Sequence, residues 1–390
     1  MNNLTIDRQT EIAKLFFKLG IIGFGGPAVH ISIMEDEVVK RRQWLTREQF
    51  LDILGATNLI PGPNSTEMAI HIGYIRGGWL GLIIAGVCFI VPAVTITAIF
   101  AWIYVKFGQL PQVTPFLSGI KPVVLAIILN AIWRLGKSAF KSRKMWLIAI
   151  PVAGATWLGL NEAIALLLGG FLGMFWLQIS DKFNQPNNNL NSLLITLPFS
   201  TLLAKVTPFP KPENIPLWQL GLFFLKVGSV LFGGGYLLIA FLEGELVGQY
   251  HWLTKQQLLD AIAVGQFTPG PILSTATFIG YVISGIPGAI VATIGIFLPS
   301  FLFVLILNPL IPLLRNSQWT AAFLDAVNVS AVALMAVVIL RLATVTLVDP
   351  IAILLAIIAA ILTIGYHVNP AWLVLGGGFI GWLLSVLIKL

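Results

Sequence analysis

The sequence predicts an all-α integral membrane protein built from two homologous halves, and three observations predict it. Of its 390 residues, 57% are hydrophobic and only 10% are charged, and the mean hydropathy is +0.91. Uncharged stretches at 79–105 and 261–314 exceed the roughly 20 apolar residues that one spanning helix needs. Motifs of the first half recur in the second. Soluble enzymes and disordered proteins are excluded, because a soluble chain carries roughly 25% charged residues.

The spanning segments are expected to be helices. A membrane β-barrel would show segments of about 10 residues that alternate in polarity, and this chain has none. Lys18 and a glycine cluster interrupt the first apolar segment, so a cleaved signal peptide is not expected. Cys88 is the only cysteine, which excludes an intrachain disulfide and a cysteine metal site. The net charge of +7 is interpreted as orienting the chain in a bilayer, and nucleic acid is not expected as a partner.

The chain is a tandem repeat with an offset of 208 residues. Phe24-Gly25-Gly26 recurs as Phe232-Gly233-Gly234, Trp44-Leu45-Thr46 as Trp252-Leu253-Thr254, and Pro61-Gly62-Pro63 as Pro269-Gly270-Pro271. Such self-similarity indicates two copies of one structural unit. We therefore predict an N-terminal repeat over 1–180, a linker rich in asparagine and proline over 181–216, and a C-terminal repeat over 217–390.

Each half contains the same order of apolar segments. In the first half they are 12–34, 48–75 with the Pro-Gly-Pro break, 79–105, 113–133, 145–160 and 162–179. In the second half they are 217–242, 256–283, 285–307, 320–340, 350–366 and 370–388.

The basic residues predict the topology of the first half. One basic stretch is 40–47 and another is 134–144, and the matching loops of the second half carry far fewer Lys and Arg. Both basic loops are expected in the cytoplasm, so an even number of crossings separates them. This leaves 48–75 as a broken re-entrant segment and gives about five spanning helices per half. An odd number of spanning helices in the first half makes the second half begin on the opposite side of the membrane, so the halves are inverted repeats. The alternative is a parallel repeat in which the broken segment spans the membrane fully.

The interrupted segments are the candidate substrate site. Proline ends a helical hydrogen-bond ladder, and a helix that restarts after it presents backbone N–H groups with a partial charge of about +0.5, which suits an oxyanion. Matching broken segments in two halves are a pointer to a transporter site; the alternative is that Gly and Pro only permit kinks and close packing. The candidate substrate-binding residues are Gly25, Gly26, Pro61, Gly62, Pro63, Asn64, Ser65, Thr66, Gly233, Gly234, Pro269, Gly270, Pro271, Ser274 and Thr275.

Two further candidates are the repeat-related lysines Lys18 and Lys226, which lie six residues before the glycine motifs. Charges inside apolar segments tend to line a pathway, so these lysines would neutralise a bound anion. The alternative is that they snorkel to the interface. Arg134 and Arg341 are interpreted as cations at helix C-termini. The recurring acids Glu35, Glu37, Glu243 and Glu245 are expected to face water, and Asp52 and Asp260 to be helix-packing partners or part of a gate.

Glu67 and His71 are the candidates for proton coupling. They are four residues apart and so share a helix face, and a carboxylate beside an imidazole can take up protons. The alternative for Glu67 is a capping box, because Asn64-x-x-Glu67 has that form.

No catalytic motif competes with these candidates. The sequence has no Gly-x-Ser-x-Gly, no His-Glu-x-x-His and no phosphate-binding loop, so we predict that the protein is not an enzyme and uses no metal or other cofactor. Its energy source would then be an ion gradient or the membrane potential.

The residues also resemble a known family. Phe16-Phe17-Lys18-Leu19-Gly20 leading into Phe24-Gly25-Gly26-Pro27, together with the Trp-Leu-Thr and Pro-Gly-Pro motifs and their second-half copies, is similar to the chromate ion transporter family in its long, two-domain form. The resemblance covers nearly the whole chain. It implies a multi-pass protein of the inner membrane that exports chromate and confers chromate resistance, with sulfate as a related anion. One departure is Gly235, which stands where the first half has Pro27.

The sequence leaves several alternatives open. A sulfate or other oxyanion transporter, or a passive anion channel, would use the same helix ends, and a membrane enzyme acting on a lipid or quinone would have only Glu67 and His71 as a catalytic pair. The expected partners are chromate or a sulfate-like oxyanion and the lipid bilayer. A second copy in a homodimer stays open, because the sequence does not define the oligomeric state.

Overall fold

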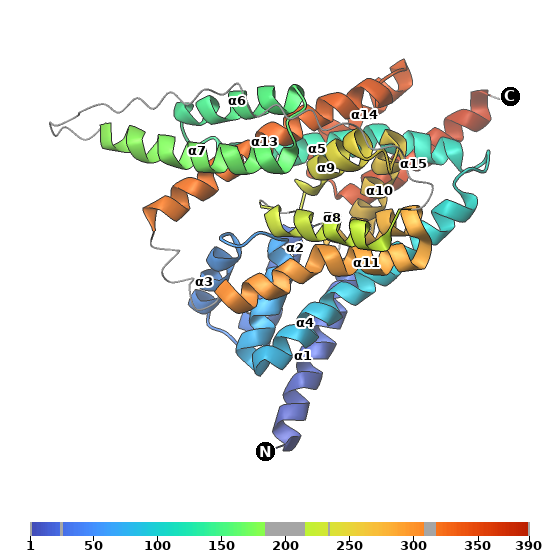
Figure 1. The fold of residues 1–390 in the computed structure, drawn as a ribbon. Helices are drawn as coiled ribbons and strands as arrows, with labels where there is room; N and C mark the ends of the chain where they lie inside the picture. Colours follow the sequence, from blue (N-terminus) through green and yellow to red (C-terminus); the bar gives the residue numbers. More distant parts are fainter. Residues whose placement is uncertain (1, 24–25, 184–214, 233–234, 308–316, 389–390) are drawn as a thin grey trace.

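The computed structural model describes residues 2–23, 26–183, 215–232, 235–307 and 317–388, and their regular structure is entirely helical (Figure 1). The helices of the first half are α1 Asn2–Ile22, α2 Pro27–Glu35, the π-helix η1 Asp36–Arg41, α3 Arg47–Thr57, α4 Asn64–Phe107, α5 Thr114–Ala139, the 3-10 helix η2 Arg143–Met145, α6 Trp146–Trp157 and α7 Glu162–Phe183. Those of the second half are α8 Leu217–Val230, α9 Leu238–Phe241, the π-helix η3 Leu242–Gln249, α10 Lys255–Phe267, the 3-10 helix η4 Ile272–Ser274, α11 Thr275–Leu307, α13 Gln318–Thr346, α14 Pro350–Ile364 and α15 Pro370–Ile388.

The repeat extends to local details of the two halves. α3 and α10 begin with the same capping box, in which the Thr46 or Thr254 side chain accepts from the backbone of the Gln three residues later. Each following helix carries one break, at Gly77–Gly78 in α4 and at Ser284–Gly285 in α11. The two homologous halves predicted from the motif spacing are therefore confirmed.

Six of the described helices are long and apolar enough to cross a membrane. At its break α4 folds back on itself, so that Gly73 and Gly81 lie backbone to backbone, and Gly280 and Gly288 do the same in α11. The 11-residue α3 and the first part of α4, residues 64–76, are each shorter than the about 20 residues a spanning helix needs. This geometry is the one expected of a broken re-entrant segment.

The two halves interleave. Within each half the first helix packs on the folded-back helix, α1 on α4 and α8 on α11, and α4 also contacts α11. The last helices cross over: α6 and α7 pack on α13, while α14 and α15 pack on α5 (Figure 1). The approach of α15 is close, because a Cβ on Gly119 would lie 2.8 Å from the Cα of Gly381. Small residues permit such backbone contact between membrane helices.

The predicted apolar segments 12–34 and 217–242 are each interrupted at the glycine motif, as the sequence indicated. The first forms α1 and α2, and the second forms α8 and α9. In the first half the reason is local: Gly26 has φ +85°, and Pro27, which lacks an N–H, starts a new helix. Of the predicted linker 181–216, residues 184–214 lie outside the described residues, and the domain boundaries and the inverted orientation remain predictions.

Candidate functional site

The two Pro-Gly-Pro motifs are each held by the opposite half of the chain. The backbone N–H of Gly62 donates to the carbonyl oxygen of Leu231 at 2.6 Å, and that of Gly270 donates to the carbonyl oxygen of Gly23 at 2.8 Å. Both donors and both acceptors are related by the 208-residue offset. The structure thus brings each Pro-Gly-Pro break to the residue that precedes the other half's glycine motif.

Both central glycines are required by the backbone. Gly62 has φ +145° and Gly270 has φ +87°, a region that residues with a Cβ rarely adopt. A Cβ on Gly62 would collide with the Glu67 carboxyl and lie 2.6 Å from Ser300 Oγ, and one on Gly270 would lie 2.7 Å from the Ala93 side chain. We call the place where Gly62 meets Leu231 and Gly270 meets Gly23 the crossing. It depends on glycine for both its backbone conformation and the space it needs.

The predicted polar residues after the two breaks have different settings. Ser65 and Thr66, in the first turn of α4, are buried, and their hydroxyl oxygens have no hydrogen-bond partner among the described residues. In the second half, Ser274 accepts from Thr97 Oγ1 at 3.2 Å and Thr275 Oγ1 donates to the Ile272 carbonyl at 2.8 Å. Among these four hydroxyls, those of Ser65 and Thr66 have no partner in the described part of the chain. Of the glycine candidates, Gly25, Gly233 and Gly234 lie outside the described residues.

Glu67 is the most unusual group at the crossing. Its side chain is fully buried, and in the described part of the chain neither carboxyl oxygen has a hydrogen-bond partner. His71 Nε2 and Ser300 Oγ are likewise buried and unpartnered. The capping box is not formed, because α4 has no side-chain cap and Asn64 donates to Asn58 Oδ1 at 2.6 Å instead. Buried polar groups normally find partners, so this cluster is a candidate site for a proton or a polar ligand.

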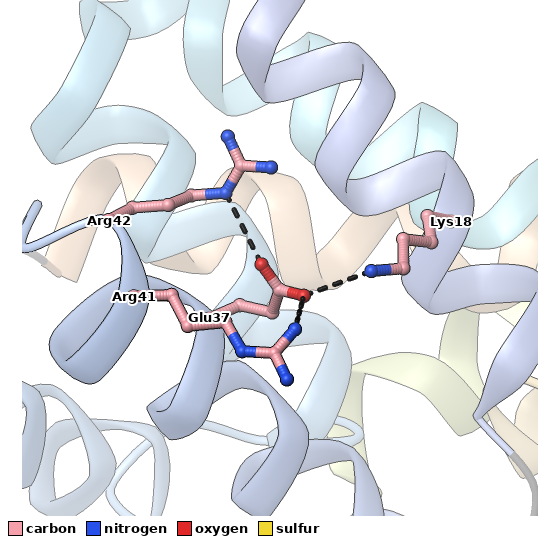
Figure 2. Close-up of polar contacts among 4 residues, drawn as sticks. All are labelled: Lys18, Glu37, Arg41 and Arg42. Carbon is pink, nitrogen blue, oxygen red and sulfur yellow. Dashed lines mark hydrogen bonds and ion pairs between the residues drawn. The ribbon is translucent and has the colours of Figure 1, made fainter.

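Lys18 lies in an ion-pair cluster around one buried carboxylate. Figure 2 shows Glu37 accepting from Lys18 Nζ at 3.0 Å, Arg41 Nη1 at 3.2 Å and Arg42 Nε at 3.4 Å. The hydrogen bond from Lys18 holds the pKa of Glu37 below its usual range. The cluster joins α1 to the π-helix η1, whose wider turn brings Glu37, Arg41 and Arg42 together.

The second half repeats this pairing, with Lys226 bound to Glu245. The expectation that the recurring acids face water was wrong for three of them: Glu37, Glu243 and Glu245 are buried. Each sits in a π-helical segment and meets a cation, and Glu243 accepts from Arg341 at 3.1 Å. Both lysine ammonium groups therefore rest on glutamates, and their predicted contact with an anion stays a prediction.

Asp260 is a helix-packing partner. It is buried, accepts from the Tyr104 hydroxyl at 2.9 Å and lies 3.8 Å from Lys121 Nζ, so it joins α10 to α4 and α5. An ion pair of this kind fixes the approach of three helices from both halves.

A polar cavity of about 400 Å³ lies beside the crossing. Its lining includes Pro27 and Ala28 after the first glycine motif, Asn58 and Asn64 on either side of Pro-Gly-Pro, and Tyr236 after the second glycine motif. Arg134, Ser138 and Asn328 complete its polar lining. The candidates from the sequence include only Asn64 of this set. One signal was available for Asn328, an isolated amide within an apolar segment at the position that Lys121 occupies in the first half.

A multi-pass helical membrane protein with two homologous halves, whose broken segments meet at their centre, is the class that this fold and site define. The profile of the chromate transporter family matches residues 10–174 and again 218–382. The chain therefore belongs to the chromate transporter family.

The names of similar proteins agree with this assignment. The chromate transport protein of Cupriavidus metallidurans is 32% identical over 95% of this chain and 92% of its own length. The probable chromate transport protein of Synechococcus elongatus is 32% identical over 90% and 88% of the two chains. The chromate transport protein of Pseudomonas aeruginosa is 31% identical over 96% and 92%. No solved structure matches the chain.

Proposed function

We propose that this protein is a secondary transporter that exports chromate from the cytoplasm across the inner membrane and so confers chromate resistance. The observation that carries the proposal is the reciprocal pair of hydrogen bonds, Gly62 to Leu231 and Gly270 to Gly23. It joins the broken segments of two homologous halves, and transporter substrates bind where such segments meet. The three relatives named as chromate transport proteins support chromate as the substrate.

Chromate is a tetrahedral dianion, and the site offers it hydrogen-bond donors. α4 begins at Asn64 directly after Pro63. The Thr66 N–H donates to the Pro63 carbonyl oxygen at 2.8 Å, which leaves the N–H groups of Asn64 and Ser65 without an acceptor in the helix. Helix N-termini attract anions through these donors and through the helix dipole. Ser65 and Thr66 add hydroxyls that no described protein group occupies. The proposed substrate site therefore lies at the first-half Pro-Gly-Pro break, where α4 begins.

Glu67 and His71 are the proposed coupling groups. Both side chains are buried one turn apart on α4, and no described cation compensates the carboxyl. A group in this setting can carry a proton in one conformation and release it in another. Substrate movement in one direction would then be linked to proton movement in the other.

Alternating access is proposed to come from motion of one half against the other, with the halves as inverted repeats. Such motion is a common mechanism in transporters with inverted repeats. The basic loops 40–47 and 134–144 would lie in the cytoplasm by the positive-inside rule. The short length of α3 and of residues 64–76 supports the re-entrant arrangement on which this topology depends.

Uptake of labelled chromate into inverted membrane vesicles tests the proposal. In such vesicles export appears as uptake, and the expected result is accumulation that depends on an imposed proton gradient and disappears when an ionophore collapses it. Vesicles that carry the Gly62→Ala variant at equal protein level provide the control. Excess sulfate measures how well the site distinguishes two similar dianions.

Two results would contradict the proposal. Equilibration without accumulation would indicate a passive anion channel. Absence of any chromate flux, with labelled sulfate transported by the same vesicles, would assign the protein to sulfate.

A further inference from the structure

The cavity beside the crossing differs from the surrounding surface in its chemistry. Its described lining contains one cation, Arg134, three side-chain amides and two hydroxyls, and no carboxylate. Three further cavities in the described part of the chain have mostly apolar walls, for example the one between Trp79 and Leu305. The polar side chains of this cavity suit a polar ligand better than those walls do.

Arg134 has no ion-pair partner among the described residues, whereas its repeat counterpart Arg341 has one. Its counterpart Arg341 donates to Glu243 at 3.1 Å and to the carbonyl oxygen of Thr156 at 2.7 Å. The residue that corresponds to Glu243 in the first half is Glu35, which lies 3.7 Å from Arg47 instead. No described carboxylate or carbonyl binds Arg134, so its guanidinium is left to the cavity.

In the described part of the chain, the repeat-related region of the second half has no equivalent polar lining. Asn64 corresponds to Ile272 and Ser138 to Val345, so the matching region of the second half lacks these groups. Ala131 and Leu135 of the cavity wall correspond to Val338 and Leu342 in the second half. These two side chains are buried, with 1% and 0% of their surface exposed, so no cavity opens there among the described residues. The structure is thus open beside Arg134 and closed beside Arg341.

Two helix N-termini reach the same cavity. Pro27 and Ala28 open the nine-residue α2, and Asn64 opens α4. Their N–H groups and dipoles add positive potential to the single charge of Arg134. Asn328 is a further polar group of the lining, and its amide has no hydrogen-bond partner among the described residues.

From these observations we infer that this cavity is the oxyanion-binding pocket and that Arg134 is its charged anchor, with Asn64 and Asn328 as further hydrogen-bond donors to a tetrahedral dianion. The inference rests on the proposed function, since it assigns residues to the substrate of that transporter. A guanidinium suits the ligand because its fixed fork of N–H donors binds two oxygens of one oxyanion at once.

Equilibrium binding of labelled sulfate and labelled chromate to the full-length protein in lipid nanodiscs tests the inference. Arg134→Gln is expected to raise Kd about tenfold or more, as for the loss of a charge-assisted hydrogen bond, and Arg134→Lys to recover part of the affinity. Lys137→Gln is the matched control, because it removes the same charge from the same helix end. Lys137 lies over the Trp133 ring and does not line the cavity.

A second measurement applies if Arg134→Gln does not fold. Cys88 is the only cysteine, so a Ser138→Cys change in a Cys88→Ala background places one thiol in the cavity wall. Sulfate is expected to slow its alkylation by a charged thiol reagent, and equal alkylation rates with and without sulfate would contradict the inference.

The failures are distinguishable. If the wild-type protein binds sulfate or chromate and Arg134→Gln binds it equally well, the pocket assignment is wrong while the proposed function stands. If Lys137→Gln weakened anion binding as much as Arg134→Gln does, the assignment would also be wrong, because any loss of positive charge at this helix end would then have the same effect. If the folded wild-type protein binds neither anion, the proposed function fails and the inference fails with it.

Discussion

The backbone N–H of Gly62 donates to the carbonyl oxygen of Leu231, and the residues 208 positions away, Gly270 and Gly23, form the same bond in the opposite sense. Each half therefore holds the break of the other. A movement that opens one of these bonds changes the position of a Pro-Gly-Pro segment relative to the facing glycine motif. The crossing is for this reason the place where binding and conformational change are most directly linked.

Gly62→Ala is expected to abolish transport and to destabilise the protein by roughly 1–3 kcal/mol, since the added Cβ meets Glu67 and Ser300 and the backbone would be strained at φ +145°. Gly55→Ala is the matched control, because nothing lies within 4 Å of a Cβ there. Thermal unfolding and vesicle uptake measured on both variants check this. Equal behaviour of the two variants would remove the steric argument for the crossing.

Glu67→Gln is expected to keep exchange of labelled for unlabelled chromate while losing accumulation driven by a proton gradient. The amide keeps the size of the side chain but cannot release a proton. Glu48→Gln, in the exposed first turn of α3, is the control and should accumulate chromate normally. Gradient-driven accumulation by Glu67→Gln would exclude Glu67 as the coupling group.

Glu37→Gln is expected to reduce the free energy of unfolding by about 1–3 kcal/mol at pH 7, because a buried carboxylate with three cationic donors is lost. The Lys18 hydrogen bond holds the pKa of Glu37 low, so the contribution is present above the unfolded-state pKa of about 4.3. It disappears as the pH falls through the lower folded-state pKa.

Thermal unfolding of wild-type and Glu37→Gln protein across this pH range measures the difference. The gap between the two should be constant from about pH 6 to 8 and should close only in acid. Asp36→Asn serves as the control, because Asp36 and its partner Lys40 are both exposed, and it should leave the unfolding unchanged. A gap that widens in acid would contradict the sign of the pKa shift.

Lys18→Gln combined with Lys226→Gln is expected to weaken oxyanion binding if the ion pairs with Glu37 and Glu245 open when substrate binds. Lys14→Gln, on the exposed side of α1, controls for general loss of charge. Equilibrium binding of labelled sulfate measures the effect. Unchanged affinity in the double variant would assign both lysines to structure alone.

Much of the fold follows from the sequence, for physical reasons. Uncharged apolar segments long enough to span a bilayer are expected to be helices. Because the motifs recur with an offset of 208 residues, a helix or break predicted in one half also predicts its counterpart in the other. The breaks at Pro-Gly-Pro were also predictable, because proline cannot continue the helical hydrogen-bond ladder. The burial of Glu37 and Glu245 could not be predicted, because it depends on π-helical turns, and these have no recognisable periodicity in the sequence.

The candidate site was predictable only in part. The sequence identified the two motif pairs, but not that each Pro-Gly-Pro would meet the opposite half, since this contact joins residues far apart in the chain. Arg134 was interpreted as a helix-end cation, as Arg341 was, because the two are equivalent in sequence. Their difference lies in the tertiary packing, where Glu243 meets Arg341 and no described carboxylate meets Arg134.

The crossed packing of α14 and α15 on α5 sets the order in which the protein can be completed during synthesis. α14 begins about 200 residues after α5 ends, which at 5–20 residues per second is a wait of roughly 10 to 40 s. Throughout that time Gly119 of α5 lacks Gly377 and Gly381 of α15, which lie against it in the finished protein. α14 and α15, which are synthesised after the other described helices, therefore complete the first half. A chain stopped before residue 350 would leave both halves unfinished.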